Sequence, residues 1–264
     1  MLKLEDIYKT FNAGTVNEKV ALRGLNLSLN EGEFVTVIGG NGAGKSTMLN
    51  SVAGVFGIDS GRIMIGGIDV TTLPEHKRAK YIGRVFQDPM LGTAATMQIE
   101  ENLALAARRG MKRTLRPGIT KADREYYREQ LKILDLGLEE RMTAKVGLLS
   151  GGQRQALTLL MATLQQPKLL LLDEHTAALD PKTAAKVLEA TERIVQKSGL
   201  TTMMITHNMR DAINYGNRLI MMYDGRIVVD VSGKEKKNLT VEQLLNLFSK
   251  ASGSDEANDK LLLS

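Results

Sequence analysis

The glycine-rich stretch Gly39–Thr47 constrains this chain more than any other part of its sequence. It fits the pattern G-x-x-x-x-G-K-[ST]. Residues 34–38 before it are apolar and β-branched, as in a buried parallel strand, and residues 46–53 after it have the pattern of a helix. A strand, a glycine loop and a helix N-terminus form an anion site together, because backbone N–H groups and the helix dipole point to one place. We therefore predict a nucleoside triphosphate site here.

The residue types in this loop suggest how the triphosphate is held. Lys45 can reach the β- and γ-phosphates, which makes it a candidate for both binding and catalysis, and the Ser46 hydroxyl can ligate Mg²⁺. The alternative is a glycine-rich turn with a chance lysine, and the flanking strand and helix patterns argue against it. The residues of the loop predicted to bind ATP are Gly39, Asn41, Gly42, Ala43, Gly44, Lys45, Ser46 and Thr47.

Composition excludes several classes of protein. With 43% hydrophobic and 25% charged residues, the chain has the composition of a soluble globular protein, and 264 residues suffice for one large α/β domain or two small ones. No apolar run reaches 18 residues and no signal peptide is seen, so neither a membrane span nor secretion is expected. The absence of cysteine excludes disulfides and thiol catalysis. A net charge of +5 with no tryptophan gives no reason to expect nucleic-acid binding.

Hydrophobic periodicity predicts an α/β fold of the P-loop NTPase type. Residues 1–32 alternate apolar and polar positions, as antiparallel strands do, whereas residues 169–172 form a continuous apolar run typical of a buried strand. Residues 96–147 carry several helical patterns and no strand pattern. We predict an ATP-binding core in residues 1–87 and 166–232, with a mainly parallel sheet and an antiparallel β subdomain. An α-helical subdomain is inserted at residues 88–165, and a C-terminal helix with a frayed tail occupies residues 233–264.

Turn and capping residues refine this prediction. Gly61–Val70 has the pattern of a hairpin, and Thr120 with Asp123 forms a capping box at a helix start. Asp180 followed by Pro181 is a typical N-cap and first helical residue. The helices expected from these patterns cover residues 100–107, 154–165, 181–197 and 240–250, and the further strands cover residues 81–87, 201–206, 218–222 and 226–231.

Polar residues stand at the ends of several apolar strands, and together they suggest hydrolysis. Asp173 can hold Mg²⁺ through water, and Glu174 can polarise an attacking water as a general base. Gln87 could contact the metal or the water, and His207 could bond the γ-phosphate. Because parallel strands end at one edge of a sheet, where open α/β sheets bind ligands, these side chains are expected near the phosphate loop.

Two features are ambiguous from spacing alone. Phe11 could stack on a purine ring or fill a β-core, and its spacing favours the core. The basic cluster between Arg108 and Arg116 has the composition of a solvated face, with anionic lipid or a protein partner as alternatives.

These motifs, in this order, resemble the ATP-binding cassette (ABC) ATPases over nearly the whole chain. The decisive segment is Leu149–Gln153, which matches the LSGGQ signature of that family. The same alignment gives Phe11 the place of the adenine-stacking aromatic and overrules the core interpretation. The other matches are Walker A at Gly39–Thr47, the Q-loop at Gln87, Walker B at Leu169–Asp173 with catalytic Glu174, the D-loop at Ala177–Asp180 and the switch histidine at His207.

The resemblance implies a mechanism and partners. In the family the signature faces the γ-phosphate of a second subunit, so Ser150, Gly151, Gly152, Gln153 and Asp180 are expected at the nucleotide of an ATP-dependent head-to-tail homodimer. The family's ATPases drive separate transmembrane permeases, and importers add an extracytoplasmic substrate-binding protein. The expected location is the cytoplasmic face of the membrane. An importer is favoured because no membrane segment is fused to the ATPase; a soluble ABC ATPase of the cofactor-assembly type and an exporter ATPase are the alternatives.

Two positions depart from the family pattern. His175 stands where proline is usual, and Ala178 stands where serine is common. Both flank the hydrolytic glutamate and therefore bear on hydrolysis rate and coupling, not on nucleotide binding. The segment Asp173–Asp180 resembles a subgroup of bacterial importer ATPases for which tryptophan- or tyrosine-type uptake has been suggested.

Overall fold

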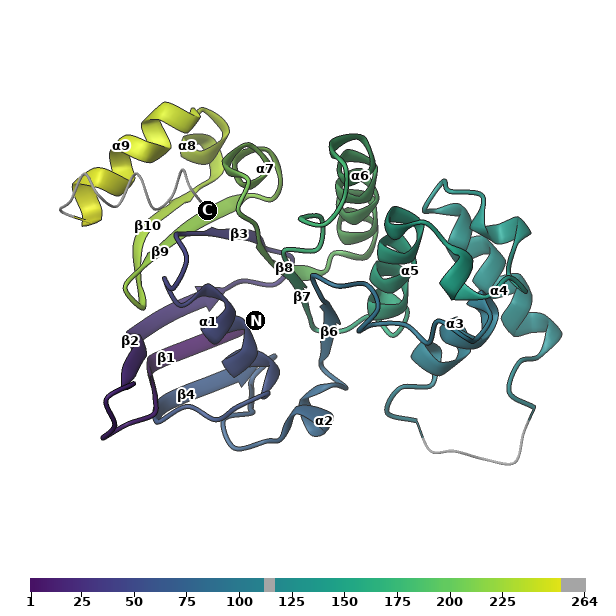
Figure 1. Ribbon diagram of the computed structural model, residues 1–264, viewed down its shortest axis with the longest axis horizontal. Helices are drawn as coiled ribbons and strands as arrows, with labels where there is room; N and C mark the ends of the chain where they lie inside the picture. The colour runs from purple at the N-terminus through teal and green to yellow at the C-terminus, as the bar shows by residue number, and fades with distance from the viewer. Residues whose placement is uncertain (112–116, 253–264) are drawn as a thin grey trace.

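A computed structural model describes residues 1–111 and 117–252 of the chain, and its centre is a mainly parallel six-stranded sheet (Figure 1). Every neighbouring pair in this sheet runs parallel except the edge pair β10–β9. The predicted α/β fold is therefore confirmed. In spatial order the strands are β10 (Arg226–Ser232), β9 (Arg218–Tyr223), β3 (Phe34–Ile38), β8 (Thr201–Ile205), β7 (Leu169–Asp173) and β6 (Ile82–Val85).

A second, antiparallel sheet lies beside α1 (Lys45–Ala53), at the lower left of Figure 1. Its inward side chains, among them Leu4, Leu25 and Ile63, share one core with Leu49 of α1. The predicted N-terminal strands and the Gly61–Val70 hairpin are confirmed. This sheet has the order β2 (Lys19–Leu29), β1 (Leu2–Phe11), β4 (Ser60–Ile65) and β5 (Ile68–Asp69).

The central strands are buried on both faces, and strict alternation divides their side chains between two cores. Leu169 and Leu171 of β7 face the core that contains α1. Leu170 and Leu172 face the opposite core, which contains residues of α5 (Gly151–Thr163) and α6 (Pro181–Ser198). The continuous leucine run is therefore explained by its position between two layers of helices and strands.

The segment between β6 and β7 is helical, as predicted. It contains α3 (Ile99–Ala107), α4 (Lys121–Lys132), the short 3₁₀ helices Leu138–Glu140 and Val146–Leu148, and α5. Arg124 of α4 donates to both carboxylate oxygens of Glu100 in α3, at 2.8 and 3.0 Å. The Thr120–Asp123 capping box is present. Lys112, Arg113 and Arg116 of the basic cluster lie outside the described residues. The boundaries of the three predicted domains stay a prediction.

The prediction for the signature helix was wrong by three residues. Helix α5 begins at Gly151 instead of Arg154, because Ser150 and Gln153 form a capping box. The signature glycines therefore lie in the first helical turn. The short helices α2 (Glu75–Arg78), α7 (Met209–Asn214) and α8 (Gly233–Lys237) were also missed, because they are too short to carry a helical periodicity.

The ends of the later helices agree with their capping signals. Helix α6 has Asp180 as N-cap and Gly199 as C-cap. Helix α9 (Val241–Ser252) follows Thr240, whose hydroxyl accepts a hydrogen bond from the Gln243 N–H at 3.2 Å. Its side chains Leu244 and Phe248 pack against β9 and β10, so it covers that end of the sheet. The predicted tail lies outside the described residues from position 253 onward.

Candidate functional site

The loop between β3 and α1 has a backbone that only glycine adopts readily. Gly42 and Gly44 have φ of 82° and 102°, and a Cβ on Gly44 would lie 2.7 Å from the carbonyl oxygen of Ala21. The loop is also held from the opposite side, where the Gly225 N–H donates to the carbonyl of Ala43 at 3.0 Å. The chain therefore holds this turn open at the N-terminus of α1, which is the arrangement of a phosphate site.

Lys45 begins α1 and folds back over the loop. Its side-chain nitrogen donates to the carbonyl oxygens of Gly39 and Gly40 at 2.5 and 3.3 Å, and the residue is 5% exposed. Burial lowers the pKa of Lys45, while the nearby carboxylates of Glu174 and Asp173 raise it. The hydrogen bonds of the Lys45 ammonium go to neutral carbonyls, so its positive charge stays available to a phosphate bound in the loop.

A pocket of about 190 Å³ opens above this loop and brings distant parts of the chain together. Residues of the loop and of the first turn of α1 form its floor. Side chains from β1, β2 and the ends of β7 and β8 form its walls. Its lining consists of Phe11, Lys19, Ala21, Asn41, Gly42, Ala43, Gly44, Lys45, Ser46, Thr47, Glu174 and His207.

Glu174 and His207 form one contact at the rim of this pocket. The His207 Nε2 lies 2.6 Å from the Glu174 Oε1. Glu174 has a φ of 47°, which is unusual for a residue with a side chain, and its N–H donates to Ile205 at 3.1 Å. The strands β7 and β8 are neighbours, so the residues that follow them meet. This direct contact places a carboxylate, which can accept a proton, and an imidazole side by side at the pocket.

Asp173 lies at the end of β7 and is paired with Arg84 of β6. The Arg84 Nη2 donates to the Asp173 Oδ2 at 3.2 Å and to the Asn50 Oδ1 at 2.7 Å. The described residues contain no cluster of three or more His, Cys, Asp or Glu that could hold a metal. A single carboxylate with the exposed hydroxyl of Ser46 fits Mg²⁺, which usually keeps phosphate oxygens and water as its other ligands.

The signature residues form a second helix N-terminus away from this pocket. The Ser150 Oγ accepts from the Gln153 N–H at 3.2 Å, and the Gln153 side chain accepts from the Ser150 N–H at the same distance. Ser150 and Gly151 are exposed, whereas Gly152 is buried so tightly against Thr183 of α6 that a side chain would collide. None of these described residues lines the phosphate-loop pocket.

Comparison with known proteins decides the family. The sequence profile of the ABC transporter family matches residues 22–177. The chain belongs to this family. It is 44% identical over 255 residues to a tyrosine transport ATP-binding protein of Clostridioides difficile, a match that covers 95% of this chain and 100% of that protein. It is 33% identical to a spermidine/putrescine import ATP-binding protein of Haemophilus influenzae, covering 94% of this chain and 61% of the relative.

Solved ABC cassettes have the same fold. A dimeric cassette in a post-hydrolysis state, bound to ADP and Pi, aligns with a TM-score of 0.75 at 30% identity, covering 88% of this chain and 98% of that one. A cassette in the ADP conformation aligns with a TM-score of 0.78 at 28% identity, covering 94% and 98%. The chain is therefore an ABC ATPase that binds nucleotide and hydrolyses ATP as the motor subunit of a transporter.

In this ABC ATPase Phe11 both packs against another ring and lines the phosphate-loop pocket. Its ring meets Phe56 edge-on at a centroid distance of 5.2 Å, and the Lys9 Nζ lies 5.4 Å from its centroid. Lys19, directly opposite Phe11 in the β1–β2 ladder, lines the same pocket and was not singled out from the sequence. Only the register of the two strands could have indicated it, because Lys19 belongs to no motif.

Gln87 is exposed and does not line the phosphate-loop pocket, so the structure does not bring it together with Lys45. The residue before it is tied to the signature helix, because the buried side chain of Gln155 donates to the carbonyl of Phe86 at 3.0 Å. Asp180 also lies outside the pocket. Its carboxylate caps α6 through the Thr183 N–H at 3.1 Å, and the hydrogen bonds from Thr183 lower its pKa.

His175, the residue that replaces the usual proline, is 2% exposed. Its Nε2 lies 3.1 Å from the Thr191 Oγ1 on α6. Burial lowers its pKa to about 4, so the imidazole is neutral near pH 7. The sequence marked His175 as a departure but gave no partner for it, because Thr191 is an ordinary helix residue. Ala178 is exposed.

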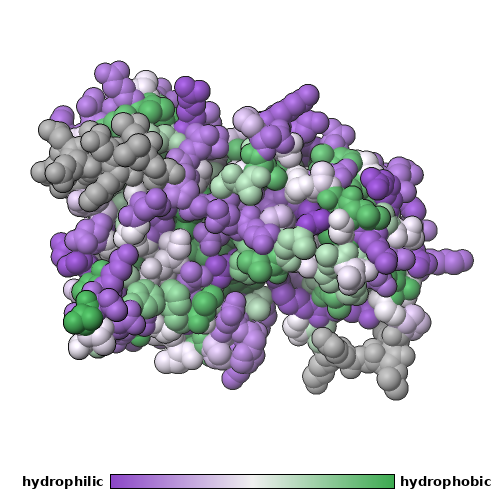
Figure 2. All heavy atoms as spheres, in the orientation of Figure 1, coloured by the Kyte–Doolittle hydropathy of each residue, from purple (hydrophilic) through white to green (hydrophobic). Residues whose placement is uncertain are grey.

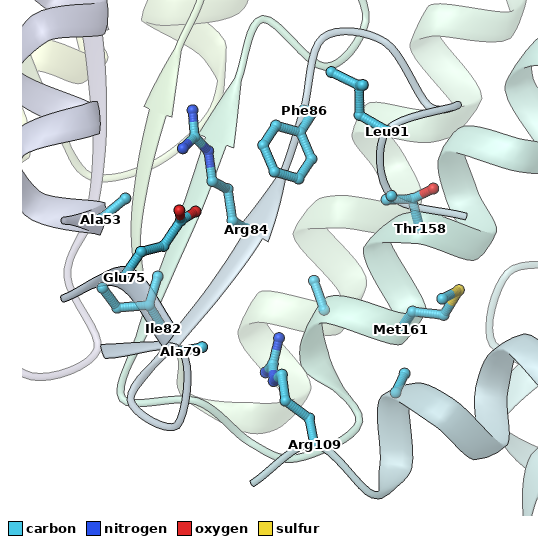
Figure 3. A pocket seen from close by; sticks show the side chains of 13 residues that line it. Ala53, Glu75, Ala79, Ile82, Arg84, Phe86, Leu91, Arg109, Thr158 and Met161 are labelled. Carbon is cyan, nitrogen blue, oxygen red and sulfur yellow. The ribbon is translucent and has the colours of Figure 1, made fainter. Parts of the chain in front are cut away.

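A groove of about 310 Å³ separates the core sheet from the helical segment (Figure 3). Ala79, Ile82 and Arg84 line it from the core side, and Leu91 and Met161 line it from the helical side. Within the described part of the chain, no helix is long and apolar enough to span a membrane. The face seen in Figure 2 is largely polar, with smaller apolar patches between.

Proposed function

We propose that this ABC ATPase powers the import of an aromatic amino acid through a separate transmembrane permease. The observation that carries the proposal is the match to the tyrosine transport ATP-binding protein, which extends over the full length of that relative. The match to the import ATPase for spermidine and putrescine supports import as the direction, at lower identity and over part of that relative. The permease, its extracytoplasmic substrate-binding protein and a location at the cytoplasmic face of the membrane belong to the same proposal.

We assign phosphate binding and proton transfer to residues of the phosphate-loop pocket. Lys45 and the N–H groups of the loop bind the β- and γ-phosphates, whose negative charge the Lys45 ammonium offsets. Glu174 accepts a proton from the attacking water, and His207, 2.6 Å away, orients that carboxylate and contacts the γ-phosphate. Bound Mg²⁺ would be held by Ser46 and Asp173, with Gln87 as a further ligand, and would offset the charge of the phosphates.

The signature turn at Ser150 and Gly151, a second phosphate cradle, supports an ATP-dependent homodimer. The turn at Ser150 and Gly151, where α5 begins, is exposed and does not line the pocket of its own chain, and a helix N-terminus of this kind can bind an anion. An ATP in the pocket would therefore meet a signature turn only from a second chain. Two chains arranged head-to-tail would each supply the phosphate loop for one ATP and the signature for the other. Gln153 and Asp180 are assigned to the same interface.

The groove between the sheet and the helical segment is assigned to the permease. Leu91 lines this groove and is 70% exposed, and the neighbouring Met90 is 47% exposed. The segment that carries both residues follows Gln87 directly. A permease helix seated there would contact the part of the chain that links the nucleotide to the signature helix, so hydrolysis could move it.

Uptake by cells tests the proposal. A strain that lacks the gene for this chain should lose uptake of labelled tyrosine or tryptophan but keep uptake of alanine. The wild-type gene should restore uptake, and Glu174→Gln, expressed at equal level, should not. Uptake of the aromatic amino acids that is unaffected by the deletion would refute the assigned substrate class, and restoration by Glu174→Gln would refute coupling to hydrolysis.

A further inference from the structure

Glu174 stands in a backbone conformation that needs support. A left-handed φ of 47° is unfavourable for a residue that carries a side chain. The segment that follows forms two tight turns, with hydrogen bonds from Ala177 N–H to Glu174 and from Leu179 N–H to Thr176, at 3.0 and 3.1 Å. These local bonds close the turns but do not fix their position relative to the rest of the fold. The Glu174 N–H donates to the carbonyl of Ile205 at 3.1 Å and ties the start of the segment to β8, which leaves its position against α6 to a second long-range contact.

The buried pair of His175 and Thr191 supplies that contact. Thr191 is 1% exposed, and its hydroxyl donates to the carbonyl of Val187 one turn earlier in α6, at 2.8 Å. The single hydroxyl hydrogen is thereby used, so toward His175 the Thr191 oxygen acts as an acceptor. The His175 Nε2 must then carry its hydrogen and donate across the 3.1 Å contact. The pair joins the residue after Glu174 to the middle of α6.

We propose that His175, anchored on the Thr191 hydroxyl, is a positioning residue for hydrolysis, which holds the Glu174 turn against α6 and aims the Glu174 carboxylate at the nucleotide. This inference rests on the proposed role of Glu174 as general base. His175 is buried and does not line the phosphate-loop pocket, so it would not touch a nucleotide bound there. Its effect is on the catalytic step, because a small displacement of a general base costs far more in rate than in substrate binding.

The test uses Thr191→Val and Thr191→Ser in the purified full chain. Thr191→Val keeps the shape of the side chain but removes the acceptor for His175, and we expect kcat for ATP to fall about ten- to hundredfold. The KM for ATP, and ATP affinity without Mg²⁺, should stay within about twofold. Thr191→Ser keeps the hydroxyl and should restore most of kcat. His175→Ala should lose a similar factor, and the double variant should lose no more than either single one.

Thr163→Val is the matched control. Thr163 is also buried, and its hydroxyl bonds the carbonyl of Leu159 one turn earlier in α5, at 3.0 Å, but it does not contact the Glu174 turn. Thr163→Val should lower the free energy of unfolding but leave kcat for ATP unchanged. A Thr191→Val protein with wild-type kcat, or losses that multiply in the double variant, would overturn the inference. If Glu174→Gln keeps activity, the general-base assignment fails; if it is inactive while Thr191→Val is normal, only this inference fails.

Discussion

Arg84 and Asp173 share a face of the central sheet, and a 3.2 Å hydrogen bond joins them. Their strands are parallel neighbours, and Arg84 pairs in register with Leu171, two residues before Asp173. Arg84 also lines the groove assigned to the permease (Figure 3). One guanidinium thus connects that groove to the carboxylate proposed to hold Mg²⁺. A cation so close to this carboxylate competes with the metal for its charge.

Arg84→Met should therefore lower the Mg²⁺ concentration needed for half-maximal ATPase activity. A part-buried ion pair of this kind is worth about 1 kcal/mol, so we expect a shift of about fivefold. Titration of ATPase activity with Mg²⁺ at saturating ATP measures it. Arg124→Met, which breaks the distant pair with Glu100, is the control and should leave the titration unchanged. If Arg84→Met needed more Mg²⁺ than the wild type for half-maximal activity, Arg84 would not compete with Mg²⁺ for Asp173.

Lys45→Ala should weaken ATP binding, because it removes the buried positive charge that faces the phosphates. A charge-assisted contact contributes about 1.5–3 kcal/mol, or about ten- to hundredfold in affinity. Isothermal titration with ATP in the absence of Mg²⁺ measures the loss. Lys132→Ala, on an exposed face of α4, serves as the control. Unchanged ATP affinity in a folded Lys45→Ala protein would refute the position of the phosphate site.

Single cysteines can locate the permease, because the chain contains none of its own. Leu91→Cys, in the groove, should cross-link to the co-purified permease with a short bifunctional reagent. Val16→Cys, fully exposed in the turn between β1 and β2, should not. Cross-linking from Val16 and none from Leu91 would place the partner on another surface.

Lys236 predicts a specific dependence of stability on pH. It is 1% exposed, donates to the carbonyls of Tyr215 and Gly216 at the end of α7, and burial lowers its pKa to about 8 from 10.5. Between these values the unfolded chain keeps the proton and the folded chain does not, so the free energy of unfolding rises with pH. Below pH 8 the burial penalty is fully present.

Between pH 7 and 9.5 the free energy of unfolding of the wild type should therefore rise by on the order of 2 kcal/mol more than that of Lys236→Met. Denaturant unfolding of both proteins at the two pH values measures this difference, and titration of the other groups cancels in the comparison. A difference between the two proteins that is the same at both pH values would show that Lys236 titrates outside this window.

Sequence patterns predicted the sheet and the site residues that lie at the ends of its strands. Glu174 and His207 could be placed together because parallel strands end at one edge, and the buried runs before them were unambiguous. Gln87 follows the edge strand β6, is exposed and does not line the phosphate-loop pocket, so its role at the metal stays a prediction. Strand order alone does not fix the path of the chain after an edge strand.

The partners of lone polar residues could not be predicted. His175, Arg84 and Lys19 each depend on a residue that is distant in sequence or on strand register, and the sequence pattern does not indicate these pairs. The start of α5 was placed late for a different reason. The Ser150–Gln153 capping box was present in the sequence but was interpreted only as part of the signature.

In the proposed homodimer, ATP is enclosed between two copies of this chain. Glu174→Gln should keep ATP binding, since Lys45 and the loop are unchanged, and should slow hydrolysis about 10²–10⁴-fold. Bound ATP would then persist and hold two chains together. Wild type without nucleotide should be mainly monomeric. Adding Ser150→Arg should abolish the dimer, because its bulk fills the second cradle while the phosphate loop stays intact.

Size-exclusion chromatography with light scattering, on Glu174→Gln with and without ATP, measures this most directly. Glu174→Gln should have the mass of a dimer with ATP and of a monomer without it. The double variant Glu174→Gln with Ser150→Arg should have the mass of a monomer under both conditions. A Glu174→Gln protein that binds ATP yet stays monomeric at tens of micromolar would contradict a sandwich formed by this chain alone.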